Sequence, residues 1–366
     1  MNILILNWRD SKNPQSGGAE VLTHEMAKRW AAWGHTVVQL SASFPGARRE
    51  EVIDGVTVVR HGAWWSVHIW AFILWMVRFG AWADVVIDEA HWFPFFSILY
   101  APKKTVLLVC EVATSLFDKL FPKPLSLLGQ ALERVYFVLY RRTPTLAISP
   151  STKEALIAAG FAKERVAVLP MGLTVPVKDS QIKRKETIPT IAYLGRLHTL
   201  KGAHDAVKAF SFIKRNIPRS QFWIIGDGDS AYKQKIKQQI KDLGLTDSTR
   251  FFGFVDEKQK FELLSRAYIL LAPSTHEGWG LTVVEAAYQG TPTITYNVGG
   301  LCDSVQHDKT GVVVSNNTPQ ALAHEALSLL SDAKRYARYQ NFGKLWSRGL
   351  SWDFTAKVAL SAIEKM

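Results

Sequence analysis

Residues 273–292 read PSTHEGWGLTVVEAAYQGTP, and this stretch decides how the chain folds. A short apolar run typical of a buried strand precedes it, and a helical pattern begins near Gly280. Gly280 lets the backbone approach a ligand closely, and the free N–H groups of Leu281 and Thr282 point at an anion, helped by the helix dipole. A strand, a glycine loop and a helix in this order predict a parallel sheet, which binds ligands at the carboxyl ends of its strands.

The same alternation of short apolar runs and helical segments continues along the whole chain. It predicts two series of parallel strands, separated by a polar linker at 174–189. The predicted fold class is therefore α/β, with two Rossmann-like, doubly wound domains that face a central cleft. We place these domains at 1–172 and 173–349, and we expect a helix at about 350–366 to pack back on the first. Strands are predicted near 2–7, 36–41, 56–60, 84–88, 104–109, 145–148 and 165–169, and then near 190–195, 221–225, 249–252, 268–272, 292–296 and 311–314.

Composition argues against a disordered or fibrous protein, because 48% of the 366 residues are hydrophobic and 21% are charged. A net charge of +12 favours an anionic partner, but the excess forms no basic stripe interleaved with aromatic residues. We therefore expect no nucleic-acid partner. A strand pattern follows Met1 directly and no signal peptide is visible, which predicts a cytoplasmic protein. Cys110 and Cys302 match no metal-ligand spacing, and we expect two buried thiols.

Two carboxylates and two cations accompany the predicted turns. Glu277 lies in the loop before the helix and Glu285 lies one turn inside it, so both can face the same crevice. A carboxylate beside a phosphate site suits hydrogen bonds to ribose hydroxyls, and we assign this role to Glu285. Arg196 and Lys201 lie on another strand-to-helix turn, where two cations stabilise a diphosphate as it leaves a glycosyl group. Each of these residues alone would be typical of a solvated surface.

The sequence EGWGLTVVEA, which contains both carboxylates, resembles the signature of the retaining glycosyltransferases of family 4, or glycosyl transferases group 1. GRLHTLKG at 195–202 is similar to the family's diphosphate-binding turn, and GGAE at 17–20 resembles the glycine loop of its first domain. The resemblance implies a GT-B fold and a nucleotide-diphosphate sugar as donor, with no further cofactor. It implies that Glu277 contacts the hydroxyls of the donor sugar. The donor-binding residues that it implies are Gly17, Gly18, Arg196, Lys201, Gly280, Leu281, Thr282 and Glu285.

Asp227 and Asp229 are spaced like the metal-binding Asp-x-Asp of metal-dependent sugar transferases. They lie at a strand-to-helix turn, however, where Asp229 can serve as a helix N-cap. Family 4 enzymes typically carry a similar Gly-x-Gly there and need no metal, so we predict no metal site. The turn also lacks the third glycine of a dinucleotide fingerprint, which disfavours a nicotinamide dehydrogenase.

The acceptor side is predicted to follow the strand at 84–88, where residues 88–94 read DEAHWFP. Many family members place a histidine just after this strand, near the donor sugar and the acceptor. His91 is therefore the second candidate catalytic residue, beside Glu277. An alignment through Pro94 puts Glu89 there instead, and a purely structural histidine is a third interpretation.

Residues 64–79 read WWSVHIWAFILWMVRF and are apolar almost all round. The segment lies between two predicted strands of one sheet, so we do not expect it to span a membrane. Tryptophans at 64, 65, 70 and 75 fit the boundary of a bilayer, and nearby Arg78 could add attraction to anionic lipid. A second apolar helix at about 125–140 ends in Arg141 and Arg142. We expect 64–79 to contact the inner face of a membrane and the acceptor to be a glycan or lipid-linked.

The functional hypothesis is a metal-independent hexosyltransferase that retains anomeric configuration. A sugar-nucleotide epimerase of the same fold is an alternative, because fold alone does not separate the two activities. A catalytically silent subunit that binds a partner transferase is another. The presence of all four charged residues of the donor site argues against a silent subunit.

Overall fold

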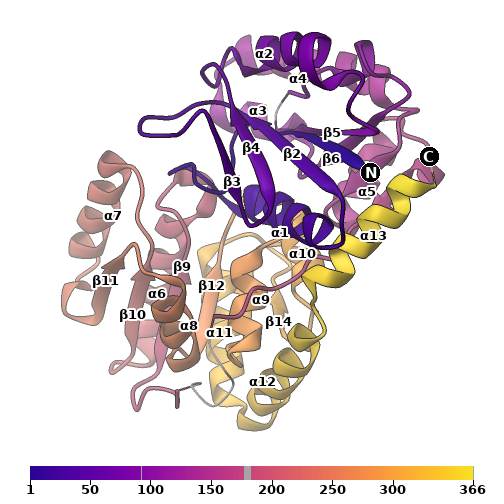
Figure 1. The fold of residues 1–366 in the computed structure, drawn as a ribbon. Coiled ribbons are helices and arrows are strands. Elements are labelled where there is room, and N and C mark those ends of the chain that lie inside the picture. The colour runs from indigo at the N-terminus through magenta and orange to yellow at the C-terminus, as the bar shows by residue number, and fades with distance from the viewer. Residues whose placement is uncertain (92, 177–182, 366) are drawn as a thin grey trace. The chain divides into compact units, whose positions relative to one another are not determined.

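The computed structural model describes residues 1–91, 93–176 and 183–365. The chain divides into two compact units. Unit 1 comprises Met1–Gly172 and Ser351–Met366, and unit 2 comprises Leu173–Leu350. Each unit is built on its own sheet with helices on both faces (Figure 1).

Unit 1 contains an eight-stranded sheet in the order β3-β4-β2-β1-β5-β6-β7-β8. Its central strands are apolar runs buried on both faces, which is typical of parallel sheets covered by helices. β3 is the antiparallel edge strand, and we did not predict it because it begins with two charged residues and none of its four residues is buried. The strands are β1 (Asn2–Leu6), β2 (Thr36–Ser41), β3 (Glu50–Ile53), β4 (Val56–Arg60), β5 (Val85–Ala90), β6 (Thr105–Val109), β7 (Thr145–Ala147) and β8 (Val166–Val168).

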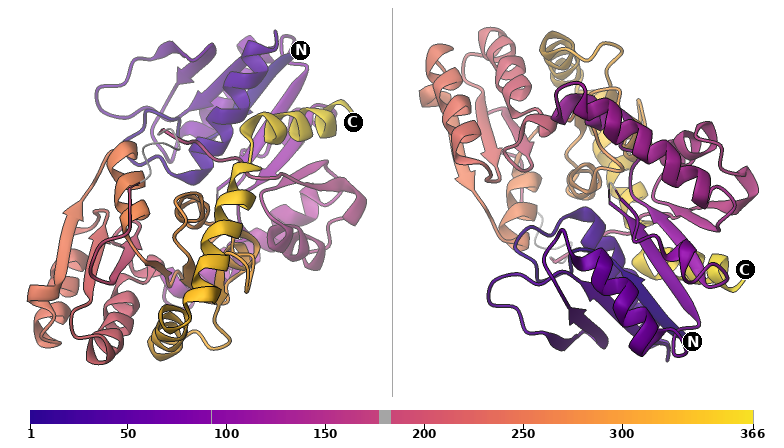
Figure 2. Two further views of the ribbon diagram at one scale, coloured as in Figure 1. Left: turned by 90° about the horizontal axis from the view of Figure 1, so that it is seen from below. Right: turned by 90° about the horizontal axis from the view of Figure 1, so that it is seen from above.

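The helices of unit 1 cover the two faces of this sheet (Figures 1 and 2). Leu4, Val86 and Leu107 lie on one face by their register, and the core clusters pack α2, its π-helical continuation η1 (Trp75–Phe79) and α4 against them. On the other face α1 packs against α13, where the indole N–H of Trp30 donates to the carbonyl of Ala356 at 3.0 Å. The helices are α1 (Gly18–Ala32), α2 (Val67–Leu74), α3 (Thr114–Leu120), α4 (Leu125–Tyr140), α5 (Pro150–Ala158) and α13 (Trp352–Glu364).

Unit 2 contains a six-stranded parallel sheet in the order β11-β10-β9-β12-β13-β14. A large apolar cluster fills one face of the sheet, and a second cluster fills the other. The strands are β9 (Thr190–Leu194), β10 (Gln221–Ile225), β11 (Thr249–Gly253), β12 (Ile269–Ala272), β13 (Thr293–Thr295) and β14 (Gly311–Val313). The helices are α6 (Ala203–Asn216), α7 (Ser230–Asp242), α8 (Glu257–Arg266), α9 (Leu281–Tyr288), α10 (Gly299–Ser304), α11 (Pro319–Ser331) and α12 (Ala333–Arg348). The predicted α/β class and both series of strands are confirmed.

Candidate active site

The strand order of unit 2 reverses between β9 and β12. The chain runs outward from β9 to β11, returns to β12 and then runs the other way to β14. Connections on the two sides of such a reversal diverge, and a ligand crevice forms at the carboxyl ends of the strands. The turn after β9 carries Arg196 and Lys201, and the turn after β12 carries Glu277. The two turns touch, because the N–H of Thr275 donates to the carbonyl of Leu200 at 2.8 Å.

Lys201 and Glu277 form an ion pair across these two turns. Nζ of Lys201 lies 2.5 Å from Oε2 of Glu277, and their side chains are 36% and 17% exposed. Arg196 is exposed on the same turn as Lys201. The hydroxyl of Tyr193 donates to the carbonyl of Arg196 at 2.9 Å and so anchors the turn. The two turns at the reversal point of the sheet therefore carry two cations and one carboxylate.

The beginning of α9 completes this edge of unit 2. Gly280 has a φ of +110°, and a Cβ there would lie 3.0 Å from the side chains of Leu301 and Ser304. Only glycine adopts this conformation in this space without strain. Gly280 at the N-cap of α9 has no side chain that could accept from the first turn, so the N–H groups of Leu281 and Thr282 can point at an anion.

Glu285 lies one turn inside α9 and is 8% exposed. Its Oε1 accepts a hydrogen bond from Nζ of Lys260 on α8 at 2.7 Å. Its Oε2 is buried and has no hydrogen-bond partner among the described residues. Burial raises the pKa of Glu285, and the ammonium group of Lys260 opposes this rise. A buried carboxylate oxygen without a donor is costly, and the hydroxyl of a ligand is one group that can supply the missing hydrogen bond.

The turn after β10 carries the two aspartates. The carboxylate of Asp229 accepts a hydrogen bond from the N–H of Tyr232 at 2.8 Å and caps α7, which confirms the predicted N-cap. Asp227 accepts from Nζ of Lys233 at 2.8 Å. Both carboxylates are therefore engaged in contacts that explain their positions in this turn.

The strand order of unit 1 also reverses, between β1 and β5. The loop after β1 leads to Gly17 and to α1, which begins at Gly18. The carboxylate of Glu20 is buried and accepts hydrogen bonds from the N–H of Gly17 at 2.5 Å and from Nε of Arg9 at 2.8 Å. The predicted glycine loop is thus fixed to the start of α1 by a charged contact that spans the loop.

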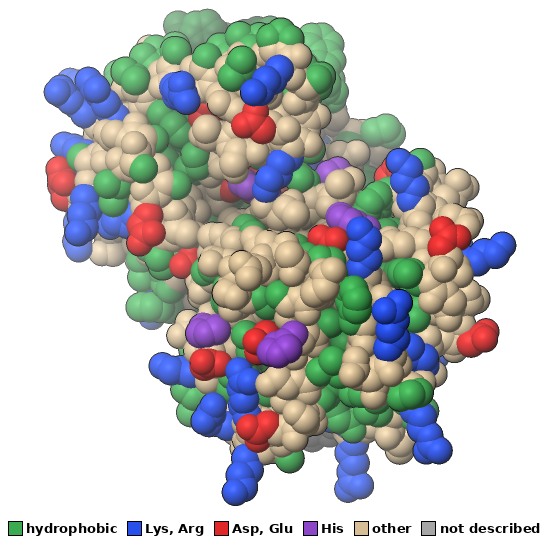
Figure 3. Space-filling view, turned by 180° about the vertical axis from the view of Figure 1, so that it is seen from behind, with side chains coloured by type: hydrophobic (Ala, Val, Ile, Leu, Met, Phe, Trp, Pro, Cys, Tyr) green, Lys and Arg blue, Asp and Glu red, His purple; other side chains and the backbone are tan. Residues whose placement is uncertain are grey.

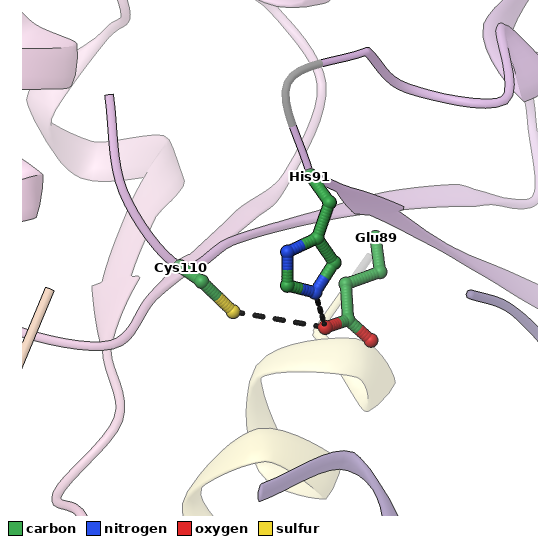
Figure 4. Close-up of side chains that lie close together, drawn as sticks. All are labelled: Glu89, His91 and Cys110. Carbon is green, nitrogen blue, oxygen red and sulfur yellow. Dashed lines mark hydrogen bonds and ion pairs between the residues drawn. The ribbon is translucent and has the colours of Figure 1, made fainter. Parts of the chain in front are cut away.

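His91 and Glu89 both lie at the end of β5, so both sequence alignments point to the same small cluster (Figure 4). Nε2 of His91 lies 2.8 Å from Oε1 of Glu89, whose other oxygen accepts from Asn7 and from Thr23, each at 2.6 Å. The thiol of Cys110, just after β6, lies 3.7 Å from Oε1 of Glu89. Glu89 is fully buried and holds the imidazole in one orientation.

The protonation of this cluster follows from its burial and its carboxylates. Burial lowers the pKa of His91, but the hydrogen bond and charge of Glu89 outweigh burial, and the pKa lies above its ordinary value. Burial, and then the charge of Glu89, raise the pKa of the Cys110 thiol well above its usual range. Ligand atoms of all three residues lie within 4.8 Å of one another, so together they could hold a metal ion. In the structure they form one hydrogen-bonded network.

The apolar segment 64–79 forms the end of a loop, α2 and η1. Trp75 is 7% exposed and belongs to the core, so its assignment to a surface group of four tryptophans was wrong. Arg78 is paired with Glu50 at 3.0 Å through both terminal guanidinium nitrogens, so its charge is partly neutralised. No helix among the described residues is long and apolar enough to cross a membrane.

Several functional contacts could not be foreseen from the sequence. Lys260, Asn7 and Thr23 carry no motif of their own, and they reach the site residues only through tertiary packing. Arg9 was also missed, although a cation close to a glycine loop could have suggested a carboxylate partner such as Glu20. Cys302 is exposed, so the expectation of two buried thiols was wrong for this residue.

Two doubly wound units, each with charged residues gathered where its strand order reverses, define the class of GT-B proteins. Solved structures agree over the full length of the chain. Sucrose-phosphate synthase from Thermosynechococcus elongatus matches with a TM-score of 0.82 and 19% identity, over 100% of this chain and 98% of that chain. HepE from Anabaena, solved in complex with UDP and glucose, matches with a TM-score of 0.76 and 18% identity, over 100% of both chains. At these identities the likeness shows the GT-B fold alone.

Family models identify the chain more narrowly. The model described as Glycosyltransferase Family 4 matches residues 16–175, and the model described as Glycosyl transferases group 1 matches residues 176–346. Glycogen synthase from Mycobacterium tuberculosis is 27% identical over 92% of this chain and 89% of its own length. 2-Deoxystreptamine N-acetyl-D-glucosaminyltransferase from Niallia circulans is 32% identical over 39% of this chain and 36% of its own length. The chain belongs to glycosyltransferase family 4, as its motifs predicted, and these relatives give no support to an epimerase.

Proposed function

We propose that unit 2 binds a nucleotide-diphosphate sugar and that the enzyme transfers the sugar with retention of anomeric configuration. The observation that carries this proposal is that Arg196, Lys201 and the start of α9 all lie on the turns at the reversal point of the sheet. Cations and free N–H groups at one edge suit a diphosphate. The names of relatives agree with the proposal: one is a GDP-mannose-dependent mannosyltransferase, and HepE was solved with UDP.

Each donor-site residue has a role in this proposal. Arg196, Lys201 and the N–H groups of Leu281 and Thr282 stabilise the diphosphate as it leaves, Glu277 binds hydroxyls of the donor sugar, and Glu285 binds the ribose. Gly17, Gly18 and Gly280 allow close approach of the backbone. The carboxylates of Asp227 and Asp229 have partners of their own, so we assign no metal to this turn, and we propose a metal-independent reaction without a cofactor.

The experiment is a screen of UDP-, GDP- and ADP-sugars for binding by calorimetry and for slow hydrolysis, with EDTA present throughout. We expect one donor to bind and to be hydrolysed, with release of its nucleoside diphosphate. Glycan and lipid-linked acceptors are then added to that donor, and the anomeric configuration of the product is read by NMR. An inverted product contradicts the retaining mechanism, and failure of every nucleotide sugar to bind contradicts the donor assignment.

On the acceptor side we propose that His91 takes part in the transfer and that Glu89 orients its ring. The support is the geometry of the pair, since the carboxylate of Glu89 is held by two further donors and lies 2.8 Å from Nε2 of His91. A histidine ring that a carboxylate holds in one orientation is the usual arrangement of a general acid or base in an enzyme. A His91→Gln variant should keep donor binding and lose transfer.

We further propose that unit 1 docks on the inner face of a membrane through α2, η1 and α4. On α2 and η1, with the loop before them, the apolar side chains that are at least 36% exposed are Trp64, Trp65, Ile69, Trp70, Phe72, Ile73, Met76 and Val77. Figure 3 shows hydrophobic side chains gathered at the top of unit 1. An exposed apolar surface of this extent marks an interaction site.

Helix α4 carries large apolar side chains on both faces, since Tyr136 and Phe137 on its inward face pack in the core of unit 1. Its inward face buries the carboxylate of Glu133, which accepts from the N–H of Ala113 at 2.7 Å, and the hydroxyl of Tyr140, which donates to Asp88 at 2.6 Å. Its outward face exposes seven apolar side chains, namely Leu125, Leu127, Leu128, Leu132, Val135, Val138 and Leu139. A helix whose outward face meets water normally carries polar side chains on that face.

A bilayer with anionic lipid fits this surface because of the charges at the two ends of α4. Lys123 precedes the helix and Arg141 and Arg142 follow it, and all three are exposed. The only carboxylate within α4 is the buried Glu133. Arg134, in the middle of the helix, is exposed as well, so the exposed charges on α4 and at its ends are positive. Exposed apolar side chains together with cations are the pattern of helices that lie in the headgroup region. Co-flotation with phosphatidylglycerol vesicles tests the proposal, and a chain that ignores such vesicles at low salt contradicts it.

A further inference from the structure

Lys260 is a buried cation that the donor-site motifs do not include. It is the fourth residue of α8, its side chain is 14% exposed, and its Nζ contacts two carboxylates. One is Glu285 on α9, at 2.7 Å, and the other is Glu257, at 2.8 Å, one turn earlier on α8. A lysine is seldom buried to this extent unless its charge is matched.

The contact gives the two oxygens of Glu285 different surroundings. Oε1 accepts the hydrogen bond from Lys260, while Oε2 is buried and has no hydrogen-bond partner among the residues that the structure describes. The ammonium group thus fixes the carboxylate by one oxygen and leaves the other oxygen for a donor from outside the protein. Without Lys260, the carboxylate of Glu285 would be free to rotate, and it would take up a proton more readily.

We propose that Lys260 is a positioning residue that keeps Glu285 ionised and oriented toward the ribose of the nucleotide. The proposal rests on the ribose-binding role proposed above for Glu285. It deepens that role, because Lys260 would decide whether the buried carboxylate can discriminate a ribose from a sugar that lacks its hydroxyls.

The electrostatics of the pair support this role. Burial raises the pKa of Glu285, the charge and hydrogen bond of Lys260 lower it, and the charge of Glu257 raises it. Burial lowers the pKa of Lys260, but the two carboxylates outweigh burial and raise it. Lys260 and Glu257 are the charged groups whose fields act on Glu285, so changes at these two positions must shift its ionisation in opposite directions.

The experiment compares binding of UDP, GDP and ADP with binding of their 2′,3′-dideoxy counterparts, by calorimetry, between pH 6 and pH 9. For the diphosphate that binds, the ratio of the two Kd values cancels the titration of the phosphates, which both ligands share. In the wild type we expect roughly 10- to 100-fold weaker binding of the dideoxy ligand, as for loss of hydrogen bonds to a charged group. In Lys260→Met the ratio should fall below about 3-fold at pH 7 and recover as the pH rises, since only the ionised carboxylate accepts both hydroxyls.

Two further variants separate charge from structure. Lys260→Arg keeps the cation and should restore most of the ratio at pH 7, and an Arg variant that behaves like Lys260→Met overturns the proposal. Glu257→Gln removes the competing carboxylate, whose side chain is 58% exposed, and should keep the ratio high to lower pH than in the wild type. This variant tests the same field if Lys260→Met does not fold.

The outcomes distinguish this inference from the role of Glu285. A wild-type ratio near 1 refutes the assignment of Glu285 to the ribose and with it the basis of the inference. A wild-type ratio in the expected range that Lys260→Met leaves unchanged at every pH refutes the role of Lys260 alone.

Discussion

Replacing Lys201 with alanine should separate catalysis from stability in unit 2. In the proposed mechanism its ammonium group faces the diphosphate as negative charge develops there. Two unit charges about 5 Å apart interact by about 3 kcal/mol at an effective dielectric constant of about 20. The variant also leaves the carboxylate of Glu277 without its partner at 2.5 Å, so that it repels the diphosphate. We expect kcat/KM to fall by at least about 10²-fold, since about 1.4 kcal/mol corresponds to a factor of ten.

The folded state should lose little in the same variant. The side chains of Lys201 and Glu277 are 36% and 17% exposed, and exposed ion pairs contribute about 0–1 kcal/mol to the free energy of unfolding. The melting temperature should therefore change by no more than about 4 °C. A large loss of rate with a small loss of stability is the expected signature of a charge that acts on the leaving group.

The matched control is Arg266→Ala. Arg266 pairs with Glu186 at 2.5 Å, and their side chains are 35% and 27% exposed, close to the values for Lys201 and Glu277. This pair precedes β9 and β12 and so lies at the opposite end of the sheet from the donor site. Initial rates of donor hydrolysis and thermal melts are measured for both variants. Turnover of Lys201→Ala within threefold of the wild type, or an equal loss of rate in Arg266→Ala, would refute the reasoning.

Four further outcomes are expected. Arg196→Ala should also lower kcat/KM by about 10²-fold with a nearly unchanged melting curve, and normal turnover would remove it from the mechanism. Chelation by EDTA should leave the transfer rate intact, whereas loss of activity that Mg²⁺ or Mn²⁺ restores would contradict a metal-independent reaction. Trp64→Ser combined with Trp70→Ser should weaken binding to anionic vesicles, measured by flotation, while a double variant that floats like the wild type would show that these side chains do not meet lipid. Glu89→Gln removes the largest interaction that raises the pKa of His91, so the ring should titrate at lower pH by NMR, and an unmoved titration would mean that the pair is not coupled.

Local patterns were sufficient for the elements and for much of the donor site. Strands of parallel sheets are short apolar runs, and a strand–glycine–helix sequence has few possible conformations, so the turn that leads into α9 could be recognised from its letters. The cap at Asp229 followed from the same local reasoning, because a capping side chain contacts a backbone N–H only three residues away. The edge strand β3 was missed because one exposed face and its charges conceal the apolar pattern.

Contacts between distant segments could not be predicted in this way. Lys260 reaches Glu285 from another helix, and Thr23 reaches Glu89 from α1, because strand order and register bring these elements together. In a single sequence, the spacing of residues does not indicate which distant segments are in contact. For the same reason, the alignment that favoured His91 and the one that favoured Glu89 became compatible once both were seen in one hydrogen-bonded pair.

Burial shows the division most clearly. The apolar sequence of 64–79 predicts that part of this segment is shielded from water, but it does not indicate which side chains pack on the sheet. Folding placed Trp75 in the core and left Trp70 at the surface, because α2 and η1 each present only one side to the strands. The sequence thus determined the fold class, the family and the turns that carry charge. The tertiary structure decided the partner of each charge and the tryptophans that remain exposed, because both depend on packing between segments far apart in the chain.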